Sequence, residues 1–454
     1  MKKISIIFIS LFFLASFFLF SNSSGSQFIK SFIPSQLKDF LKNNFFYIPS
    51  LISENRKLKN ETTDLYSKIE KLSLLKNTQN ENFFPITQFL KLSYFEISLD
   101  NIKSEFKYER YGDVVNPVYL EIYDNRLILA SKDGKLFYEK INNILDKKIK
   151  LNAISTNLSN KIEITDLLIY KEYLYVALVN KDKDLCNIPN LNILRARIDF
   201  KNLEFENIFK QKNDNNIKVS KEDCGFAPTG GVLEIYKKNN NEYLIFSAEG
   251  SVENNIQSIE NITNNNNFLK TDKSANIYSL ELKNKNIELI STGHRNPLGL
   301  IVTKDNNILS TEHGPRGGDE INLITKGGNF GWPAVSYGEP YSTDYNSIYY
   351  YKKDHEKYGF IEPIYSFIPS IGVSRIIEVN NNFSKKWQNN FLITSLKKRS
   401  IYRVEFDKSY KKIKYIEAMV LGKRIRDIIY SPIHKIFFLT LEDGPGYLGV
   451  MSNK

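Results

Sequence analysis

Short apolar segments alternate with polar turns along most of the chain after about residue 92. Each unit has an apolar strand, a turn rich in Asn, Asp, Gly and Lys, and a second apolar strand that ends in small residues. The unit occurs six times, with second strands centred on Ile128, Val176, Ile245, Leu309, Ile393 and Phe438. The five steps from residue 128 to residue 438 average 62 residues, and each unit is followed by further strand-like sequence.

This period predicts an all-β fold, a six-bladed β-propeller with four-stranded blades over residues 91–454. A blade buries both of its faces against neighbouring blades, so its second strand should be apolar almost throughout. A β-sandwich is the alternative, but sandwiches rarely need this many strands or this long a period.

Residues 27–90 have a different pattern. Leucines recur every seven residues at Leu51, Leu58, Leu65 and Leu72, with charged residues between them. This spacing predicts a helical tether with a narrow apolar stripe. Two arrangements fit it: a short coiled coil that forms a homodimer through residues 51–72, or a helix that packs on its own domain.

Residues 1–26 predict export. Lys2 and Lys3 precede an uncharged, apolar run over residues 4–20, and a small polar stretch follows it. This is the order of a secretory signal peptide, but the run is also at the lower limit for a membrane span. Because no A-x-A-like cleavage site is clear, a retained membrane anchor is slightly favoured. Either interpretation predicts a periplasmic or other extracytoplasmic location.

The composition adds limits on function. A net charge of +11 suggests nucleic acid or a membrane surface as a partner, but scattered lysines usually form a solvated surface, and export argues against nucleic acid. The two cysteines exclude a Cys-rich zinc module. In an oxidising compartment we expect Cys186 and Cys224 to form a disulfide, with two unpaired buried thiols as the alternative.

The densest group of unusual residues lies between 293 and 340. A GHRNP turn at residues 293–297 and a GPRGG turn at residues 314–318 flank one predicted strand pair. Glycine-rich turns let the backbone approach a ligand closely, and their carbonyl oxygens are suited to a hard cation. We therefore expect a ligand site near the central channel, in preference to turns with a purely structural role.

This segment resembles the glucose/sorbosone dehydrogenase family, soluble aldose dehydrogenases that use pyrroloquinoline quinone. The motifs that carry the resemblance are GHRNP, EHGPRGGDEINLI and NFGWP, and weaker similarity extends over roughly residues 110–450. The resemblance implies a six-bladed β-propeller, in agreement with the repeat. It also implies oxidation of a sugar or related alcohol by hydride transfer to the quinone, with an unknown electron acceptor.

The resemblance assigns roles to individual residues. Arg295 and Asn296 match contacts beside the quinone carbonyls, and the carbonyl oxygens of Gly314 and Pro315 match those that hold a catalytic calcium ion. In SLKKRS and GKRIRD, the residues that match ligands of the cofactor carboxylates are Lys397, Arg424 and Arg426. Because the cofactor carries three carboxylates, we expect these cations to have no acidic neighbours.

One position departs from the family pattern. The family places a catalytic histidine just before a Gly-Gly pair, and here Pro228 occupies that position. Proline is not a competent base. His294 and His313 lie in the site turns as substitutes, although we expect both to be hydrogen-bonded turn residues. Two functions remain open: a dehydrogenase with an altered base, or an inactive membrane-tethered propeller that binds carbohydrate, cofactor or a partner protein.

Overall fold

The computed structural model describes residues 90, 92–99, 108–110, 113–180, 190–211, 230–248, 276–332, 334–339 and 351–453. All of them belong to the second of two units of the chain, Asn80–Lys454. The predicted export segment and, apart from Leu90, the predicted tether lie outside these residues. Within the described part of the chain, no helix is long and apolar enough to cross a membrane.

The first three blades follow one another along the chain. Blade 1 has β4 (Val118–Tyr123), β5 (Arg126–Ser131), β6 (Leu136–Lys140) and β7 (Asn152–Thr156). Blade 2 has β8 (Ile162–Tyr170), β9 (Tyr173–Asn180), β10 (Leu191–Arg197) and β12 (Glu206–Lys210). Blade 3 has β13 (Leu233–Lys238), β14 (Asn241–Ala248), β15 (Asn276–Glu281) and β16 (Ile287–Thr292). Two short strands, β11 (Asn202–Leu203) and β20 (Gly328–Asn329), add in parallel to the edges of blades 1 and 3.

The last three blades close the ring. Blade 4 has β17 (Pro297–Val302), β18 (Ile308–Glu312), β19 (Asp319–Ile324) and β21 (Tyr365–Phe367). Blade 5 has β22 (Val373–Glu378), β23 (Asn390–Ser395), β24 (Ser400–Phe406) and β25 (Ile413–Val420). Blade 6 has β26 (Ile425–Ser431), β27 (Ile436–Leu441) and β28 (Tyr447–Asn453), and its outer strand is β1 (Leu92–Ser98) from the start of the domain.

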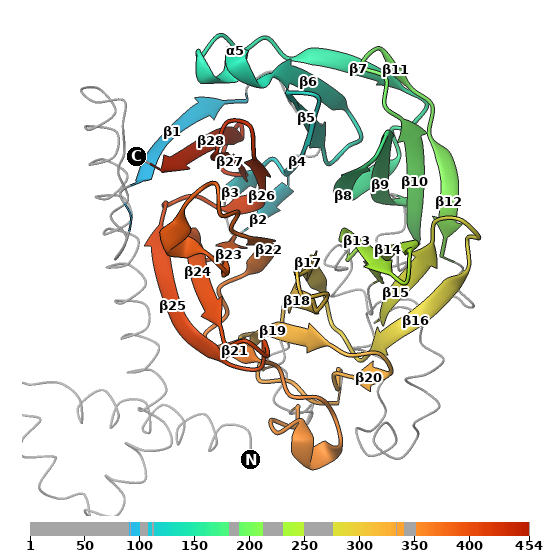
Figure 1. Ribbon diagram of the computed structural model, residues 1–454, viewed down its shortest axis with the longest axis vertical. Coiled ribbons are helices and arrows are strands. Elements are labelled where there is room, and N and C mark those ends of the chain that lie inside the picture. The colour runs from blue at the N-terminus through green and yellow to red at the C-terminus, as the bar shows by residue number, and fades with distance from the viewer. Residues whose placement is uncertain are drawn as a thin grey trace, which may run out of the picture. The chain divides into compact units, whose positions relative to one another are not determined.

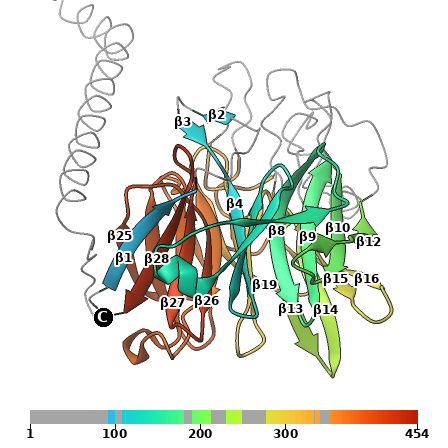
Figure 2. The same cartoon turned by 90° about the horizontal axis from the view of Figure 1, so that it is seen from above.

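Few other elements are present among the described residues. A short hairpin pairs β2 (Tyr108–Arg110) with β3 (Asp113–Val115) and lies beyond the end of β4, at one face of the ring (Figure 2). One α-helix, α5 (Ile141–Leu145), connects β6 to β7. The 3-10 helices η2 (Glu356–Tyr358) and η3 (Lys385–Trp387) lie in loops.

The inner strands β4, β8, β13, β17, β22 and β26 surround a common axis, and each contacts the next around the ring (Figure 1). All six predicted second-strand centres lie in the second strand of their blade, and each is at most 1% exposed. The main apolar core consists of six clusters, one between each pair of adjacent blades. The predicted all-β six-bladed propeller is therefore confirmed, and burial on both faces accounts for the apolar second strands.

Candidate active site

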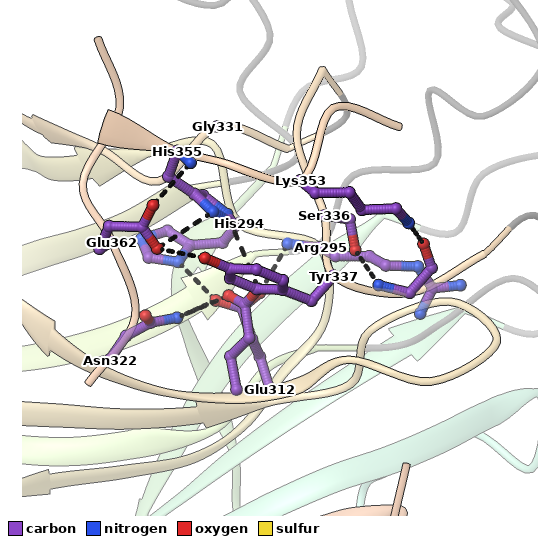
Figure 3. Close-up of polar contacts among 12 residues, drawn as sticks. His294, Arg295, Glu312, Asn322, Gly331, Ser336, Tyr337, Lys353, His355 and Glu362 are labelled. Atoms are coloured by element: carbon purple, nitrogen blue, oxygen red, sulfur yellow. Dashed lines mark hydrogen bonds and ion pairs between the residues drawn. The ribbon is translucent and has the colours of Figure 1, made fainter. Parts of the chain in front are cut away.

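The GHRNP turn is held by a buried histidine–carboxylate pair. His294 is 0% exposed, and its Nδ1 lies 3.0 Å from Oε1 of Glu312, the last residue of β18 (Figure 3). The other ring nitrogen lies 2.8 Å from the Ser291 hydroxyl, and Asn322 donates to Glu312 at 2.6 Å. Burial alone would raise the pKa of Glu312, but His294 and the hydrogen-bond donors lower it. Because an ionised carboxylate only accepts, Nδ1 of His294 carries the proton.

Arg295 is fixed at both its backbone and its side chain. Its backbone N–H donates to Oε2 of Glu312 at 2.7 Å, which fixes the backbone of the residue. Its guanidinium donates to the carbonyl oxygens of His313 at 3.3 Å and Gly314 at 3.1 Å. The guanidinium also lies 5.2 Å from the ring centre of Trp332. The two predicted turns therefore meet through this one cation.

A second buried carboxylate lies beside Glu312. The Asn322 amide also donates to Glu320 at 3.3 Å, so one amide bridges two carboxyl groups. Burial raises the pKa of Glu320 well above its ordinary value, and the negative charge of Glu312 adds to the rise. Two adjacent acids with opposite shifts favour one charged and one neutral group. His355, which is 1% exposed, lies 3.8 Å from Glu320.

A small hollow lies among these groups. Its walls include Arg295, Glu312, His313, Glu320 and Trp332. The Trp332 indole N–H is buried without a hydrogen-bond partner in the described structure. An unpaired buried donor is rare in folded proteins, so this N–H group is available to a ligand as a hydrogen-bond donor.

Asn296 follows Arg295 and also has a buried polar atom without a hydrogen-bond partner among the described residues. The residue is 7% exposed, and its side-chain Oδ1 is buried with no partner among the described residues. Its backbone carbonyl accepts from the N–H of His313 at 3.0 Å, which again joins the two turns.

The GPRGG turn is packed too closely for any other residue at Gly314. A Cβ atom there would lie 2.2 Å from the Gly318 carbonyl oxygen. The Gly314 N–H donates to Asp319 at 3.2 Å, and Arg316 exchanges two backbone hydrogen bonds with Glu339. The turn therefore presents backbone carbonyls from a fixed position. In the described part of the chain, no cluster of three or more His, Cys, Asp or Glu residues could hold a metal ion.

Lys397 lies in the turn between β23 and β24, with an exposed side chain. Its backbone N–H donates to the Ile371 carbonyl at 3.0 Å. Gly372 follows directly, and a Cβ atom on it would lie 2.9 Å from the Lys397 nitrogen. The position of the Lys397 backbone is therefore set by the loop that leads into β22.

The two C-terminal arginines have an acidic neighbour. Glu442 is 0% exposed, accepts from Nε of Arg424 at 3.0 Å and forms an ion pair with Arg426. Burial alone would raise the pKa of Glu442, but Arg426 and Arg424 lower it. The expectation that these cations lie without acids is therefore wrong for this pair. The physical reason is that two largely buried guanidinium groups need a compensating charge in the core.

The propeller axis carries a charged cluster that the sequence interpretation missed. Arg375 of β22 lies 2.6 Å from Asp166 of β8 and 3.6 Å from Asp427 of β26. Each aspartate also accepts a backbone N–H from an adjacent inner strand, Leu233 for Asp166 and Leu120 for Asp427, both at 2.8 Å. Burial raises the pKa of Asp166 to about 6, although Arg375 opposes the rise.

A sequence signal for this axial cluster existed. In TDLLIY, SRIIEV and RDIIYS, the charged residue of the cluster directly precedes an aliphatic pair within an inner strand. A second hollow adjoins the axial cluster, and its lining includes Arg426, Leu298 and Gly230. It therefore connects one predicted cofactor ligand with the residue after GHRNP and with the Gly-Gly pair.

The structure separates the candidate bases. Both ring nitrogens of His294 are engaged and the residue is fully buried, so it supports the turn and cannot face a substrate. His313 is only partly buried and lines the smaller hollow. Pro228 and the predicted disulfide partners, Cys186 and Cys224, lie outside the described residues.

The sequence is similar to known proteins. A family model described as glucose/sorbosone dehydrogenase matches residues 116–448. The aldose sugar dehydrogenase YliI of Escherichia coli (strain K12) is 33% identical over 170 residues, or 36% of this chain and 43% of that protein. Quinoprotein glucose dehydrogenase B of Acinetobacter calcoaceticus is 27% identical over 201 residues, or 33% of this chain and 42% of that protein. The chain thus aligns with less than half the length of these relatives.

The fold is also found among solved structures. The crystal structure of a glucose dehydrogenase matches with a TM-score of 0.57 at 21% identity, over 73% of this chain and 95% of that one. At this identity the match supports a shared fold.

Proposed function

Because the chain belongs to the glucose/sorbosone dehydrogenase family, we propose that it oxidises a sugar or a related alcohol with pyrroloquinoline quinone as its cofactor. Two of its relatives are an aldose sugar dehydrogenase and a quinoprotein glucose dehydrogenase. When bound, the quinone supplies the hydride acceptor. The observation that carries the proposal is the fixed Arg295 guanidinium, placed between Trp332 and the Gly314 carbonyl.

Two residues next to Arg295 offer unpaired polar groups to a ligand. The unpaired Asn296 oxygen and the unpaired Trp332 indole N–H are both buried in the described structure. A preorganised guanidinium stabilises negative charge that develops on a nearby oxygen without reorganisation during the reaction. We propose that Arg295 performs this role, with Glu312 holding it in place.

The cofactor carboxylates would bind Lys397, Arg424 and Arg426. Glu442 accepts from Nε of Arg424, so this hydrogen bond does not use the two terminal nitrogens of the guanidinium. Glu442 offsets one of the two arginine charges, and exposed Lys397 adds a further positive charge. Arginine suits this role because its planar fork matches a carboxylate.

A calcium ion would use the carbonyl oxygens of Gly314 and Pro315. Calcium prefers six to eight oxygen ligands. The absence of a carboxylate cluster among the described residues means that water and the cofactor would supply most of the other ligands. We propose this ion as part of the loaded site.

The base that removes the hydroxyl proton differs from the family pattern at Pro228. His313 is the candidate in the described structure, because it lines the hollow beside Arg295 while His294 is enclosed. We also retain three proposals from the sequence: an extracytoplasmic location, an anchor at residues 4–20 and a dimer through residues 51–72.

The first test is binding. The protein contains two tryptophans, and only Trp332 lies in the site, so quinone added with calcium should quench fluorescence in the wild type. Arg424→Ala combined with Arg426→Ala should weaken binding at least about tenfold, since each charged hydrogen bond contributes about 1.5–3 kcal/mol. The control is Arg197→Ala, a 73% exposed arginine of blade 2. Absence of wild-type binding would rule out the quinone.

The second test is turnover. The loaded protein should reduce a redox dye with at least one member of a sugar panel, and Pro228→His should increase the rate by up to about 10²–10⁴-fold if only the base was lost. Tight quinone binding without dye reduction by either protein would instead favour the inactive binding propeller.

A further inference from the structure

Asp319, the first residue of β19, is a buried hub between blades 4 and 5. It is 1% exposed. Its Oδ1 accepts from the Gly314 N–H at 3.2 Å and from the Ser370 hydroxyl. Its Oδ2 accepts from the N–H groups of Gly372 at 2.6 Å and Val373 at 3.2 Å. All four donors belong to loop segments or the first residue of a strand, so this side chain fixes backbone outside its own strand.

One side of the hub is the turn whose carbonyl oxygens are proposed to hold calcium. Gly314 contacts Asp319 through its N–H and Arg295 through its carbonyl oxygen. Because a peptide unit is planar, the bond to the Gly314 N–H fixes the orientation of the His313 carbonyl, which accepts from Arg295 at 3.3 Å. The close packing of Gly314 against Gly318 limits the movement of Gly314 itself.

The other side of the hub leads to Lys397. The Gly372 carbonyl accepts from the Leu396 N–H at 2.7 Å, and the Ile371 carbonyl accepts from the Lys397 N–H at 3.0 Å. Gly372 has a φ of 67°, a left-handed conformation that glycine adopts without strain. Short hydrogen bonds therefore connect the Asp319 side chain, through the loop that contains Ile371 and Gly372, to the backbone of Lys397.

We propose that Asp319 is a positioning residue that presets the Gly314–Pro315 turn for a cation, while its other oxygen independently sets the loop that supports Lys397. This inference rests on the proposed function, because it concerns calcium and the quinone. Partners that orient the ligands of a metal typically change its affinity 10–100-fold when they are removed.

Asp319→Asn separates the two sides. An amide has one acceptor oxygen, and the adjacent N–H groups of Gly372 and Val373 both need it. The NH₂ group then faces Ser370, whose hydroxyl accepts as well as donates, and the Gly314 N–H, which only donates. The substitution should therefore release Gly314 alone and leave the Lys397 side in place.

Amide hydrogen exchange tests the geometry without any ligand. In the wild type the Gly314 and Gly372 N–H groups should both be protected. In Asp319→Asn the Gly314 N–H should exchange at least about tenfold faster, while Gly372 stays protected. Equal acceleration of exchange at both N–H groups would show that Asp319 holds the two loops as a single unit. It would contradict the proposal that its two oxygens act independently.

Calcium titration of chelator-treated protein, with and without the quinone, tests the function of the hub. Asp319→Asn should lower calcium affinity about 10–100-fold and change quinone affinity without calcium by less than about threefold. Ser370→Ala should keep calcium affinity, since Asp319 retains Gly314. Ile393→Val, a core change in blade 5 that costs about 1 kcal/mol, controls for lost stability.

The outcomes are distinguishable. If the wild type binds calcium and quinone but Asp319→Asn binds calcium equally well, the positioning role is wrong and the proposed function stands. If the wild type binds neither, the proposed function fails and the positioning role fails with it.

Discussion

The axial cluster of Asp166, Arg375 and Asp427 and the loop carboxylates Glu312 and Asp319 are both buried, but their partners differ. On the axis, the cation is a side chain from blade 5 and its acids come from blades 2 and 6. The axial aspartates also accept backbone N–H groups, but from neighbouring inner strands. The loop carboxylates instead hold N–H groups of the GHRNP turn, of the GPRGG turn and of the loop before β22. The axial contacts therefore join blades, whereas the loop contacts orient short segments that face a ligand.

This difference distinguishes charged residues that stabilise the fold from charged residues that position the site. A side-chain ion pair between rigid inner strands contributes mainly to closure of the ring, and its loss leaves charge in the core. A carboxylate that accepts backbone N–H groups fixes a loop conformation, and its loss moves carbonyl oxygens and side chains on that loop. Substitutions should accordingly change stability most on the axis and ligand affinity most in the loops.

The largest expected effect is on the axis. Arg375→Met should reduce the free energy of unfolding by about 3–5 kcal/mol, because Asp166 and Asp427 would remain buried without their cation. Urea unfolding followed by circular dichroism measures the change. Arg197→Met, at an exposed ion pair with Glu172, should cost at most about 1 kcal/mol.

A restoring experiment sharpens this expectation. Adding Asp166→Asn and Asp427→Asn to Arg375→Met should recover about half or more of the lost stability, because no uncompensated charge remains on these three residues. Equal stability of wild type and Arg375→Met would contradict the structural role of the axial cluster.

The next largest effect is expected at Glu312, one of the two loop carboxylates. Glu312→Gln should reduce the free energy of unfolding by about 1–3 kcal/mol, because its amide NH₂ must face a donor from His294 or Asn322 or the backbone of Arg295. It should also weaken quinone binding at least about tenfold, measured by Trp332 quenching. Glu339→Gln, at a half-exposed ion pair, is the control. Lost stability with unchanged affinity would remove Glu312 from the site.

A smaller effect should depend on pH. Glu234 of β13 lies near the axial cluster, and burial raises its pKa from 4.5 to about 7. Its protonated form favours the folded state, so this contribution is present below about pH 4.5 and is lost as the pH rises to about 7. Relative to Glu234→Gln, the wild type should lose about 1–2 kcal/mol over this interval, given that the side chain is only partly buried. A constant difference from pH 4 to pH 8 would contradict the shift.

The smallest effect on stability should come from Lys397. Its side chain is exposed, so Lys397→Ala should change the free energy of unfolding by less than about 0.5 kcal/mol. Its effect on quinone affinity should nevertheless be measurable at low salt and decrease at high salt. A large loss of stability would show that the loop between β23 and β24 has a structural role for this side chain.

Local patterns in the sequence determined the repeat. The second strand of each blade is nearly all apolar because both faces are buried, so six strand centres could be placed without long-range information. The GHRNP and GPRGG turns were also visible, since glycine and proline restrict the backbone locally. The pairing of β1 with β28 could not be placed, because it joins residues from opposite ends of the domain.

Tertiary structure alone decided the partners of the charges. Arg375 and Asp166 are 209 positions apart, and Ser370 and Gly372 reach Asp319 from more than 50 positions away. The pairing of Glu442 with Arg424 and Arg426, across only 18 and 16 positions, also went unpredicted. Hydrophobic burial follows a short period that one strand reveals, whereas the partner of a buried charge depends on which blades the closed ring brings together.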